Sequence, residues 1–230
     1  MTVEAQREAW LNGQWEGEEI TLAASPQKDI VLDVTALMPK SFVGSRTVNF
    51  HYTEAGQIIV PSSSIKGVLR RWCGQICSVL DTIELEEQLF GSNTAAGCLV
   101  VSDGIYSRQP PVKSRSRILI DRVSGASLQR PLNTSAAVGG ELKIQLRLPA
   151  SYKWAVGLLL YALRDFGLGM FELGAASAIG CGYAESLSVR ASSPEGIGWV
   201  SVKDGAVSID DAGGIIHSYM EKWGGVANDP

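Results

Sequence analysis

The chain has 230 residues, of which 45% are hydrophobic, so it is long and apolar enough to bury a sizeable core. It contains no run of about 18 or more uninterrupted apolar residues, which argues against a membrane span, and residues 1–8 are polar and acidic, which argues against a signal peptide. The formal net charge of −4 at pH 7 does not identify a nucleic-acid binder. We expect a cytoplasmic protein.

Residues 1–29 are expected to form an N-terminal extension, in which Trp10 and Trp15 provide side chains to bury against the main fold or against a neighbour. A run rich in β-branched residues then predicts the first strand over 30–38. The loop that follows mixes aromatic and basic side chains, among them Arg46.

The most informative stretch is 61–72. A proline and three serines follow an extended apolar run and precede apolar residues at helical spacing, which predicts a helix to about residue 80. The serine hydroxyls, the free N–H groups of the first turn and the helix dipole favour an anion there, above all a phosphate. Lys66 and Arg70, one turn apart, can reach back toward it. An ordinary capped helix with a solvated basic face is the alternative.

Basic residues gather in the middle of the chain. A helical turn or two over 84–90 and a strand over 97–103 lead into a proline-broken loop over 106–113 and an extended stretch at 118–120. Asp121 is the only acid between residues 108 and 130. Its basic residues are Arg108, Lys113, Arg115, Arg117, Arg122 and Arg130. A basic stripe on an acidic protein indicates a backbone-phosphate binder, although a solvated loop would have the same composition.

The C-terminal half predicts a strand over 141–148, an apolar helix over 154–166 and a glycine-rich turn over 173–183 that enters another strand. A last strand and a short amphipathic helix lie in 191–230, and we expect them to pack on the main domain, 30–190. The order β-α-β, repeated, predicts an α+β fold of the ferredoxin-like kind with the helices on one face of the sheet.

Established enzyme motifs are missing from the sequence. The glycines of 180–182 enter a strand instead of opening a helix, which argues against a dinucleotide site, and neither a P-loop nor a G-x-S-x-G elbow occurs. The four cysteines lack zinc-site spacing and are predicted to be reduced thiols. The pair Asp210 and Asp211 is typical of a helix N-cap. We expect no metal and no cofactor.

Taken together, a phosphate-suited helix start, a basic centre, aromatic residues near basic ones and a glycine-rich loop favour single-stranded nucleic acid, above all RNA. Serine, lysine and arginine hold a sugar-phosphate chain without reading its sequence, and aromatic or guanidinium planes stack on unpaired bases.

Four motifs in order resemble those of the RAMP superfamily, whose members form the backbone of type III CRISPR effector complexes. Residues 61–70 resemble its P-G-S-S-L-K-G-x-L-R signature, and residues 89–103 its L-F-G … G-x-L-x-x-x-D segment. Residues 120–126 resemble its I-D-R-x-T-G-x-A block, and residues 173–182 its C-terminal glycine-rich loop.

This resemblance implies a modified ferredoxin-like (RRM-like) fold with a glycine-rich loop and added hairpins. It also implies a CRISPR RNA-binding backbone subunit that contacts target RNA, other RAMP-type subunits and a large subunit of the complex. A thumb-like excursion is expected at 131–140. By motif match or by charge, the RNA-binding candidates are Arg46, Ser63, Ser64, Lys66, Arg70, Arg115, Arg117, Arg122, Gly180 and Gly182.

The sequence departs from the family where catalysis is concerned. Members that cut target RNA carry an aspartate in the loop after the first strand, whereas residues 42–50 contain no acid. Arg46 lies near that place and can bind phosphate, but an arginine is no general base at neutral pH. We therefore expect no cleavage by this subunit. The alternative is a metal-dependent endoribonuclease subunit that uses Asp33 or Glu54 with a divalent metal.

Overall fold

The computed structural model describes residues 29–41, 51–118, 120–127, 132–174 and 180–227. Its centre is an antiparallel sheet in which β1 (Asp29–Leu37) lies between β9 (Glu141–Pro149) and β10 (Ser186–Ser193). The strand β6 (Gly104–Tyr106) pairs with the other side of β9, as does the short β5 (Val100–Val101).

Two helices connect these strands as a ferredoxin-like fold requires. The helix α2 (Ser62–Val79) lies between β1 and β6 in the chain, and α4 (Lys153–Gly167) lies between β9 and β10. The resulting order β10-β1-β9-β6 is the 4-1-3-2 arrangement of a βαββαβ unit. The predicted α+β, ferredoxin-like class is confirmed.

Further strands extend the sheet at both edges. β11 (Gly196–Lys203) and β12 (Ala206–Asp210) continue it beyond β10, and β4 (Ile58–Val60) and β3 (His51–Tyr52) continue it beyond β6. In chain order, α3 (Ile83–Phe90) follows α2, and α5 (Ile215–Ala227) follows β12.

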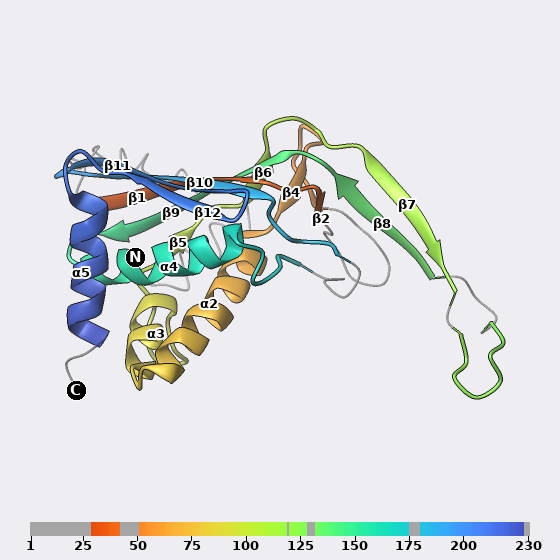
Figure 1. Ribbon diagram of the computed structural model, residues 1–230, viewed down its shortest axis with the longest axis horizontal. Helices are drawn as coiled ribbons and strands as arrows, with labels where there is room; N and C mark the ends of the chain where they lie inside the picture. The colour runs from red at the N-terminus through yellow and green to blue at the C-terminus, as the bar shows by residue number, and fades with distance from the viewer. Residues whose placement is uncertain (1–28, 42–50, 119, 128–131, 175–179, 228–230) are drawn as a thin grey trace, which may run out of the picture.

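All the described helices cover one face of the sheet (Figure 1). Strict alternation in β9 sends Leu142, Ile144, Leu146 and Leu148 into the core, while its polar residues face away from the helices. The helix α5 packs closely on α4 at Gly157, where an added Cβ would lie 2.4 Å from the carbonyl oxygen of Tyr219. The strand and helix of 191–230 thus share the hydrophobic core of the rest of the chain.

A second, smaller sheet forms an arm that projects from the body (Figure 1). It contains β2 (Lys40–Ser41), β8 (Leu132–Val138) and β7 (Val112–Arg117), in the order β2-β8-β7. Its two long strands, β7 and β8, are inserted in the chain between β6 and β9, and β2 follows β1. Two backbone hydrogen bonds fix its root: Met38 N–H to the Gly140 carbonyl, and Gly139 N–H to the Pro39 carbonyl, both 2.9 Å.

The arm is where the sequence prediction differs most from the structure. The loop expected over 106–113 becomes β7 at Val112, and the excursion expected over 131–140 contains the returning strand β8. The strand expected over 97–103 is reduced to β5. The sequence of β7 has no run of apolar residues at alternate positions, so hydrophobic periodicity gives no strand signal there. Among the described residues, no helix is long and apolar enough to cross a membrane.

Candidate nucleic-acid interface

The start of α2 is capped by an acid from a distant part of the chain. Its first turn has no side-chain cap of its own, and the N–H groups of Ser64 and Ile65 both donate to the Pro61 carbonyl. The N–H of Ser62 donates to Oδ1 of Asp103 at 2.6 Å. The side chains of Ser63 and Ser64 are exposed, so their hydroxyls are open to a ligand.

Lys66 extends from the first turn of α2 toward the loop that precedes β5. Its Nζ donates a hydrogen bond to the carbonyl oxygen of Leu99 at 3.1 Å. An ammonium group carries three donors, so this bond uses one of them. Lys66 therefore keeps its charge within reach of the helix start while it also fixes the Leu99 loop against α2.

Arg70 has a different partner from the one its spacing predicts. Its Nε forms an ion pair with Oε1 of Glu86 in α3, and its side chain remains 45% exposed. The expectation that Arg70 reaches back to the helix start is thus not what the structure shows. The guanidinium lies one helical turn farther along, on the side of α2 that faces α3.

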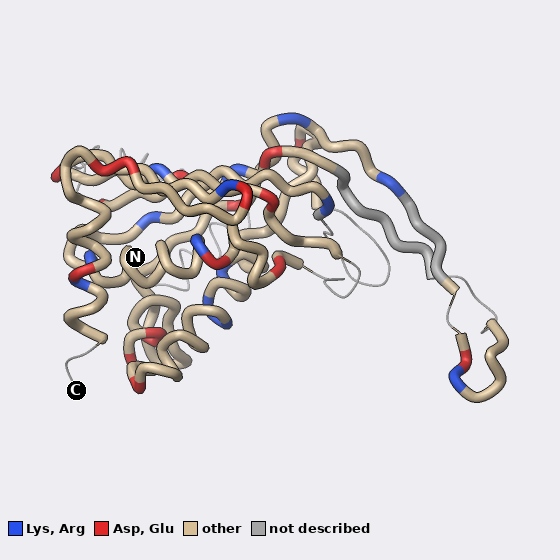
Figure 2. The backbone as a smooth tube through the Cα atoms, in the orientation of Figure 1, with Lys and Arg blue, Asp and Glu red and all other residues tan. Residues whose placement is uncertain are grey.

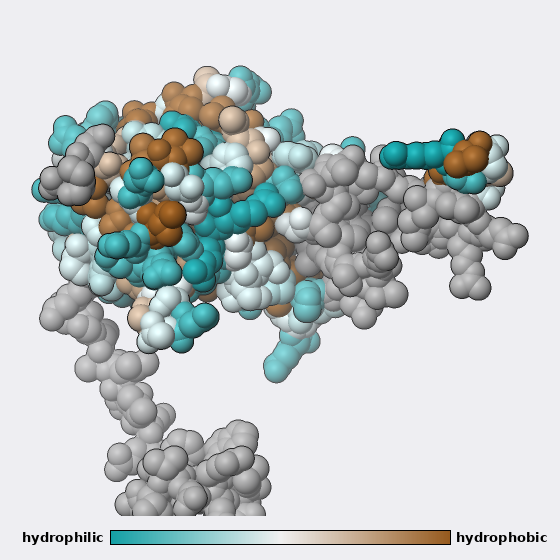
Figure 3. Space-filling model, turned by 90° about the horizontal axis from the view of Figure 1, so that it is seen from below, coloured by the Kyte–Doolittle hydropathy of each residue, from teal (hydrophilic) through white to brown (hydrophobic). Residues whose placement is uncertain are grey.

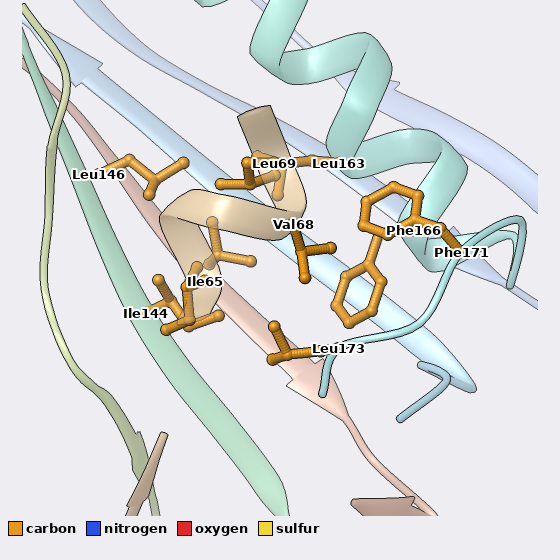
Figure 4. A pocket seen from close by; sticks show the side chains of 10 residues that line it. Ile65, Val68, Leu69, Ile144, Leu146, Leu163, Phe166, Phe171 and Leu173 are labelled. Carbon is orange, nitrogen blue, oxygen red and sulfur yellow. The ribbon is translucent and has the colours of Figure 1, made fainter. Parts of the chain in front are cut away.

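Residues 171–173, which lead into the glycine-rich segment, pack directly on α2. The Trp72 ring lies 4.9 Å from the Phe171 ring, and Arg71 pairs with Glu172 at 3.8 Å. Leu173 lines a small apolar pocket with Val68 of α2 (Figure 4). These contacts hold the beginning of the segment against the helix that carries the serines.

The end of the same segment is bonded to the root of the arm. The N–H of Gly182 donates to the Lys40 carbonyl at 2.7 Å, and its own carbonyl accepts from Leu173. Gly182 has a φ of +86°, and an added Cβ would lie 2.4 Å from the Leu173 carbonyl, so a glycine is required. Gly180 is exposed, also at positive φ, with open space around it.

The remaining basic candidates are not gathered at α2. Arg115 and Arg117 lie on β7, and Arg122 is exposed in a turn at the far end of the arm. Figure 2 shows Lys and Arg positions at the base of the arm, along β7 and at its tip. Arg46 lies outside the described residues.

The turn at the arm tip is ordered by Asp121. Its carboxylate accepts from the N–H of Val123 at 3.1 Å and from the hydroxyl of Ser124 at 2.7 Å, and these bonds lower its pKa. Ile118, Ile120 and Val123 are all exposed, and Figure 3 shows apolar surface at this end of the arm.

The two candidate catalytic acids lie apart. Asp33 is on the helix-free face of the sheet, where its Oδ1 accepts from Nε2 of Gln145 at 2.9 Å, and Glu54 is in the exposed turn between β3 and β4. Among the described residues, no group of three or more Asp, Glu, His or Cys side chains is placed to hold a metal ion. All four cysteines are free, and burial raises the pKa of the Cys73 and Cys77 thiols.

Asp103 is the residue of this site to which sequence reasoning gave no role. It lies 41 residues from Ser62 in the chain, and only the packing of the β5–β6 loop against α2 brings them together. Its position as the last residue of the 89–103 motif was the one available signal.

Comparisons with known proteins agree with this architecture. The family model of the RAMP superfamily matches residues 41–185. A chain of a structure described as type III-B Cmr-beta bound to cognate target RNA is similar with a TM-score of 0.56 and 14% identity, over 91% of this chain and 68% of that one. A chain of a CRISPR RNA-guided surveillance complex gives a TM-score of 0.50 and 14% identity, over 70% and 68%. No curated protein matches. At these identities the structural matches establish a shared fold.

Proposed function

The chain belongs to the RAMP superfamily, and we propose that it is an RNA-binding subunit of a type III-like CRISPR effector complex. The fold it shares with chains from a Cmr-beta complex and a CRISPR surveillance complex supports membership of such an assembly. In this role it binds guide RNA, and its partners are the guide, a target RNA, other RAMP-type subunits and a large subunit.

One structural observation carries the proposal. The glycine-rich segment contacts both α2 and the root of the arm, through packing of Leu173 on Val68 at one end and the Gly182–Lys40 hydrogen bond at the other. Three segments that are far apart in the sequence are therefore held next to one another. A polynucleotide needs contacts of this extent, since several phosphates must be held at once.

The first turn of α2 is the proposed phosphate contact. The hydroxyls of Ser63 and Ser64 donate to phosphate oxygens, the positive end of the helix dipole favours their charge, and Lys66 adds a full positive charge nearby. Gly180 allows the backbone of the polynucleotide to approach closely, because no side chain projects there.

The arm extends the same surface away from the body. We assign it to contact with a neighbouring subunit and with the guide–target duplex, because its ordered tip lies too far from the sheet to pack on its own domain (Figure 1). Arg122 at the tip supplies a charge for a phosphate of that duplex.

We further propose that this subunit does not cut target RNA. Residues 42–50 contain no carboxylate, and Asp33 is hydrogen-bonded on the face of the sheet opposite the helices. With guide-matched target RNA, a complex that carries Asp33→Asn or Glu54→Gln should give the same products as the wild type. Loss of any cut in either variant would show that the subunit is an endoribonuclease instead.

Co-purification of RNA tests the binding function. The complete complex is isolated through a tag on this chain, and the bound RNA is extracted and sized. We expect an RNA of discrete length, and weaker retention at raised salt and in the Lys66→Ala, Arg70→Ala double variant, because phosphate contacts depend on salt. A complex free of RNA, or retention that neither salt nor the double variant changes, would contradict the proposal.

A further inference from the structure

The helix-free face of the large sheet carries a row of side chains aligned by strand pairing. Gln145 of β9 pairs with Asp33 of β1, Asp33 pairs with Arg190 of β10, and Arg190 pairs with Trp199 of β11. Cross-strand partners project from the same face, so these four residues, the cross-sheet row, lie side by side on adjacent strands. With strands about 4.8 Å apart, the row is roughly 14 Å long.

The cross-sheet row lines a shallow depression. Lys143 and Ser188 also line it, as do Ser102 and Asp103 at the end beyond Gln145. All the described helices lie on the opposite face of the sheet (Figure 1), so no helix of the described chain covers this surface.

Trp199 forms one end of the row as a half-exposed ring. Its exposed fraction is 45%, and the guanidinium carbon of Arg190 lies 5.7 Å from the ring centroid. A large aromatic ring gains more than most side chains from burial, and the next strand beyond, β12, is exposed throughout. The ring stands between Arg190 and its other cross-strand neighbour, Asp210 of β12, and its exposed part is a stacking platform for an unpaired base.

Arg190 supplies a donor that no group of the protein satisfies. Its Nε is buried and has no hydrogen-bond partner in the described part of the chain. A buried donor without a partner is costly, and a rotation of the Arg190 side chain that brings this donor to a ligand acceptor would remove that cost. Next to it, Asp33 and Gln145 already bond to each other, which fixes their orientation and leaves acceptor oxygens on both.

One end of the depression, at Asp103, comes close to the start of α2. Ser102 and Gln145 exchange two hydrogen bonds, from Gln145 N–H to Ser102 Oγ at 2.8 Å and from Ser102 N–H to the Gln145 carbonyl at 2.9 Å. The next residue, Asp103, caps Ser62. A single strand held at the first turn of α2 can therefore follow this path onto the sheet.

The charges of the depression favour RNA over an acidic protein segment. Asp33 in the row and Asp103 at the end of the depression repel a carboxylate-rich peptide, whereas a neutral base can lie over them and place its phosphates toward Arg190 and Lys143. A duplex keeps its base faces stacked internally and offers none to Trp199. The chemistry thus selects an unpaired base.

We propose that the cross-sheet row binds one unpaired base of a single-stranded RNA. The base stacks on the exposed part of Trp199, and the adjoining nucleotides lie over Arg190, Asp33 and Gln145, with a phosphate near Lys143. This site is separate from the phosphate contact at α2, so each can be present without the other.

The test is an affinity measurement on the full chain with a fluorescein-labelled single-stranded RNA of about eight nucleotides. We expect Trp199→Ala to weaken binding about tenfold, since base–aromatic stacking is lost, and Trp199→Phe to retain most of the affinity. Lys203→Ala is the control, because Lys203 lies on the same strand and face but does not line the depression. A blunt duplex of the same length should bind the wild type and Trp199→Ala equally.

The same series is repeated in a chain that carries Ser63→Glu and Ser64→Glu, which removes the α2 contact. If Trp199→Ala still weakens RNA binding in this background, the result supports a separate base site. If Trp199→Ala binds the single-stranded RNA as tightly as its parent protein in both backgrounds, the proposal is overturned. It is also overturned if Lys203→Ala loses as much RNA affinity as Trp199→Ala does. Thermal unfolding of each variant confirms that the chain is folded.

Discussion

The carboxylate of Asp103 accepts a hydrogen bond from the N–H of Ser62 at 2.6 Å, so an acid of the chain itself occupies part of the start of α2. It satisfies one free donor of the first turn and complements the helix dipole. A phosphate that binds here must lie beside this charge, at the exposed hydroxyls of Ser63 and Ser64. Asp103 therefore stabilises the empty site and limits how tightly it holds RNA.

Removing that charge should separate the two effects. In Asp103→Asn, the helix start loses a charged cap, and we expect the free energy of unfolding to fall by about 1 kcal/mol. RNA affinity should rise several-fold at low salt, because a repulsive charge close to the phosphate is gone. Urea unfolding measures the change in stability, and RNA titration measures the change in affinity.

Asp81→Asn is the matched control for this change. Asp81 lies just beyond the other end of α2 with a φ of 55°, a conformation that asparagine also tolerates. The Asp81→Asn substitution also removes one negative charge, but at a place far from the proposed phosphate. Weaker RNA binding in Asp103→Asn than in the wild type would contradict the repulsion argument.

The Arg70–Glu86 ion pair should contribute little to stability. Because the Arg70 side chain is 45% exposed, solvent screens the pair, and we expect a coupling of about 0–1 kcal/mol. A double-mutant cycle with Arg70→Ala and Glu86→Ala in urea measures it. A coupling well above this range would mean that the pair is a structural clamp between α2 and α3.

Trp72 should contribute more to stability than the Arg70–Glu86 pair does, because its indole donates a hydrogen bond to a buried acid. Its Nε1 donates to Oδ2 of Asp165 at 3.0 Å, and Asp165 is only 9% exposed. Trp72→Phe keeps an aromatic ring against Phe171 but leaves that oxygen without this donor. We expect a loss of about 1–3 kcal/mol in the free energy of unfolding.

The surface replacement Trp199→Phe is the control, and it should stay within about 0.5 kcal/mol of the wild type. Equal effects of the two tryptophan variants would show that the Asp165 hydrogen bond does not stabilise the contact between α2 and α4.

Asp211 should give the fold part of its resistance to acid. Burial alone would raise the pKa of this 1% exposed side chain, but bonds from the N–H and the ring of His217 and from the N–H of Ile215 lower it. An acid with a lowered pKa stabilises the fold fully above its unfolded pKa of about 3.9, and the contribution disappears as the pH falls through the folded value.

We therefore expect Asp211→Asn to be less stable than the wild type near neutral pH, with the difference shrinking as the pH falls below about 4. Urea unfolding over this pH range measures it. A difference that does not depend on pH would contradict the role of the charge. Asp211 caps the first turn of α5 from outside the helix, since its Oδ1 accepts from Ile215 N–H at 2.7 Å, whereas Asp210, the other member of the predicted pair, belongs to β12.

The sequence predicts the elements whose residues repeat with a clear period. β9 alternates strictly, and α2 and α4 have apolar residues at helical spacing, so their positions agree with the structure to within about three residues. β7 lacks such a period because it belongs to an arm outside the main core, and the sequence predicts a loop at 106–113, where β7 begins. The contacts of α2 depend on tertiary packing: neither the cap from Asp103 nor the pairing of Arg70 with Glu86 can be read from local spacing.

The cross-sheet row was likewise beyond sequence reasoning. Sequence patterns identify Asp33 only as an alternative catalytic acid and assign no role to Trp199. Their neighbourhood follows from the register of four strands, in which a shift of one residue would send every side chain to the other face.

The most direct test of the central claim introduces negative charge at the first turn of α2. Glutamates at Ser63 and Ser64 complement the helix dipole and should not destabilise α2, whereas they repel a phosphate. Ser78→Glu, near the opposite end of the same helix and also exposed, is the control. The account predicts that the affinity of the complex for guide RNA falls at least about tenfold in Ser63→Glu, Ser64→Glu and stays near wild type in the control. Equal RNA retention in all three proteins would contradict the assignment of α2 as the phosphate contact.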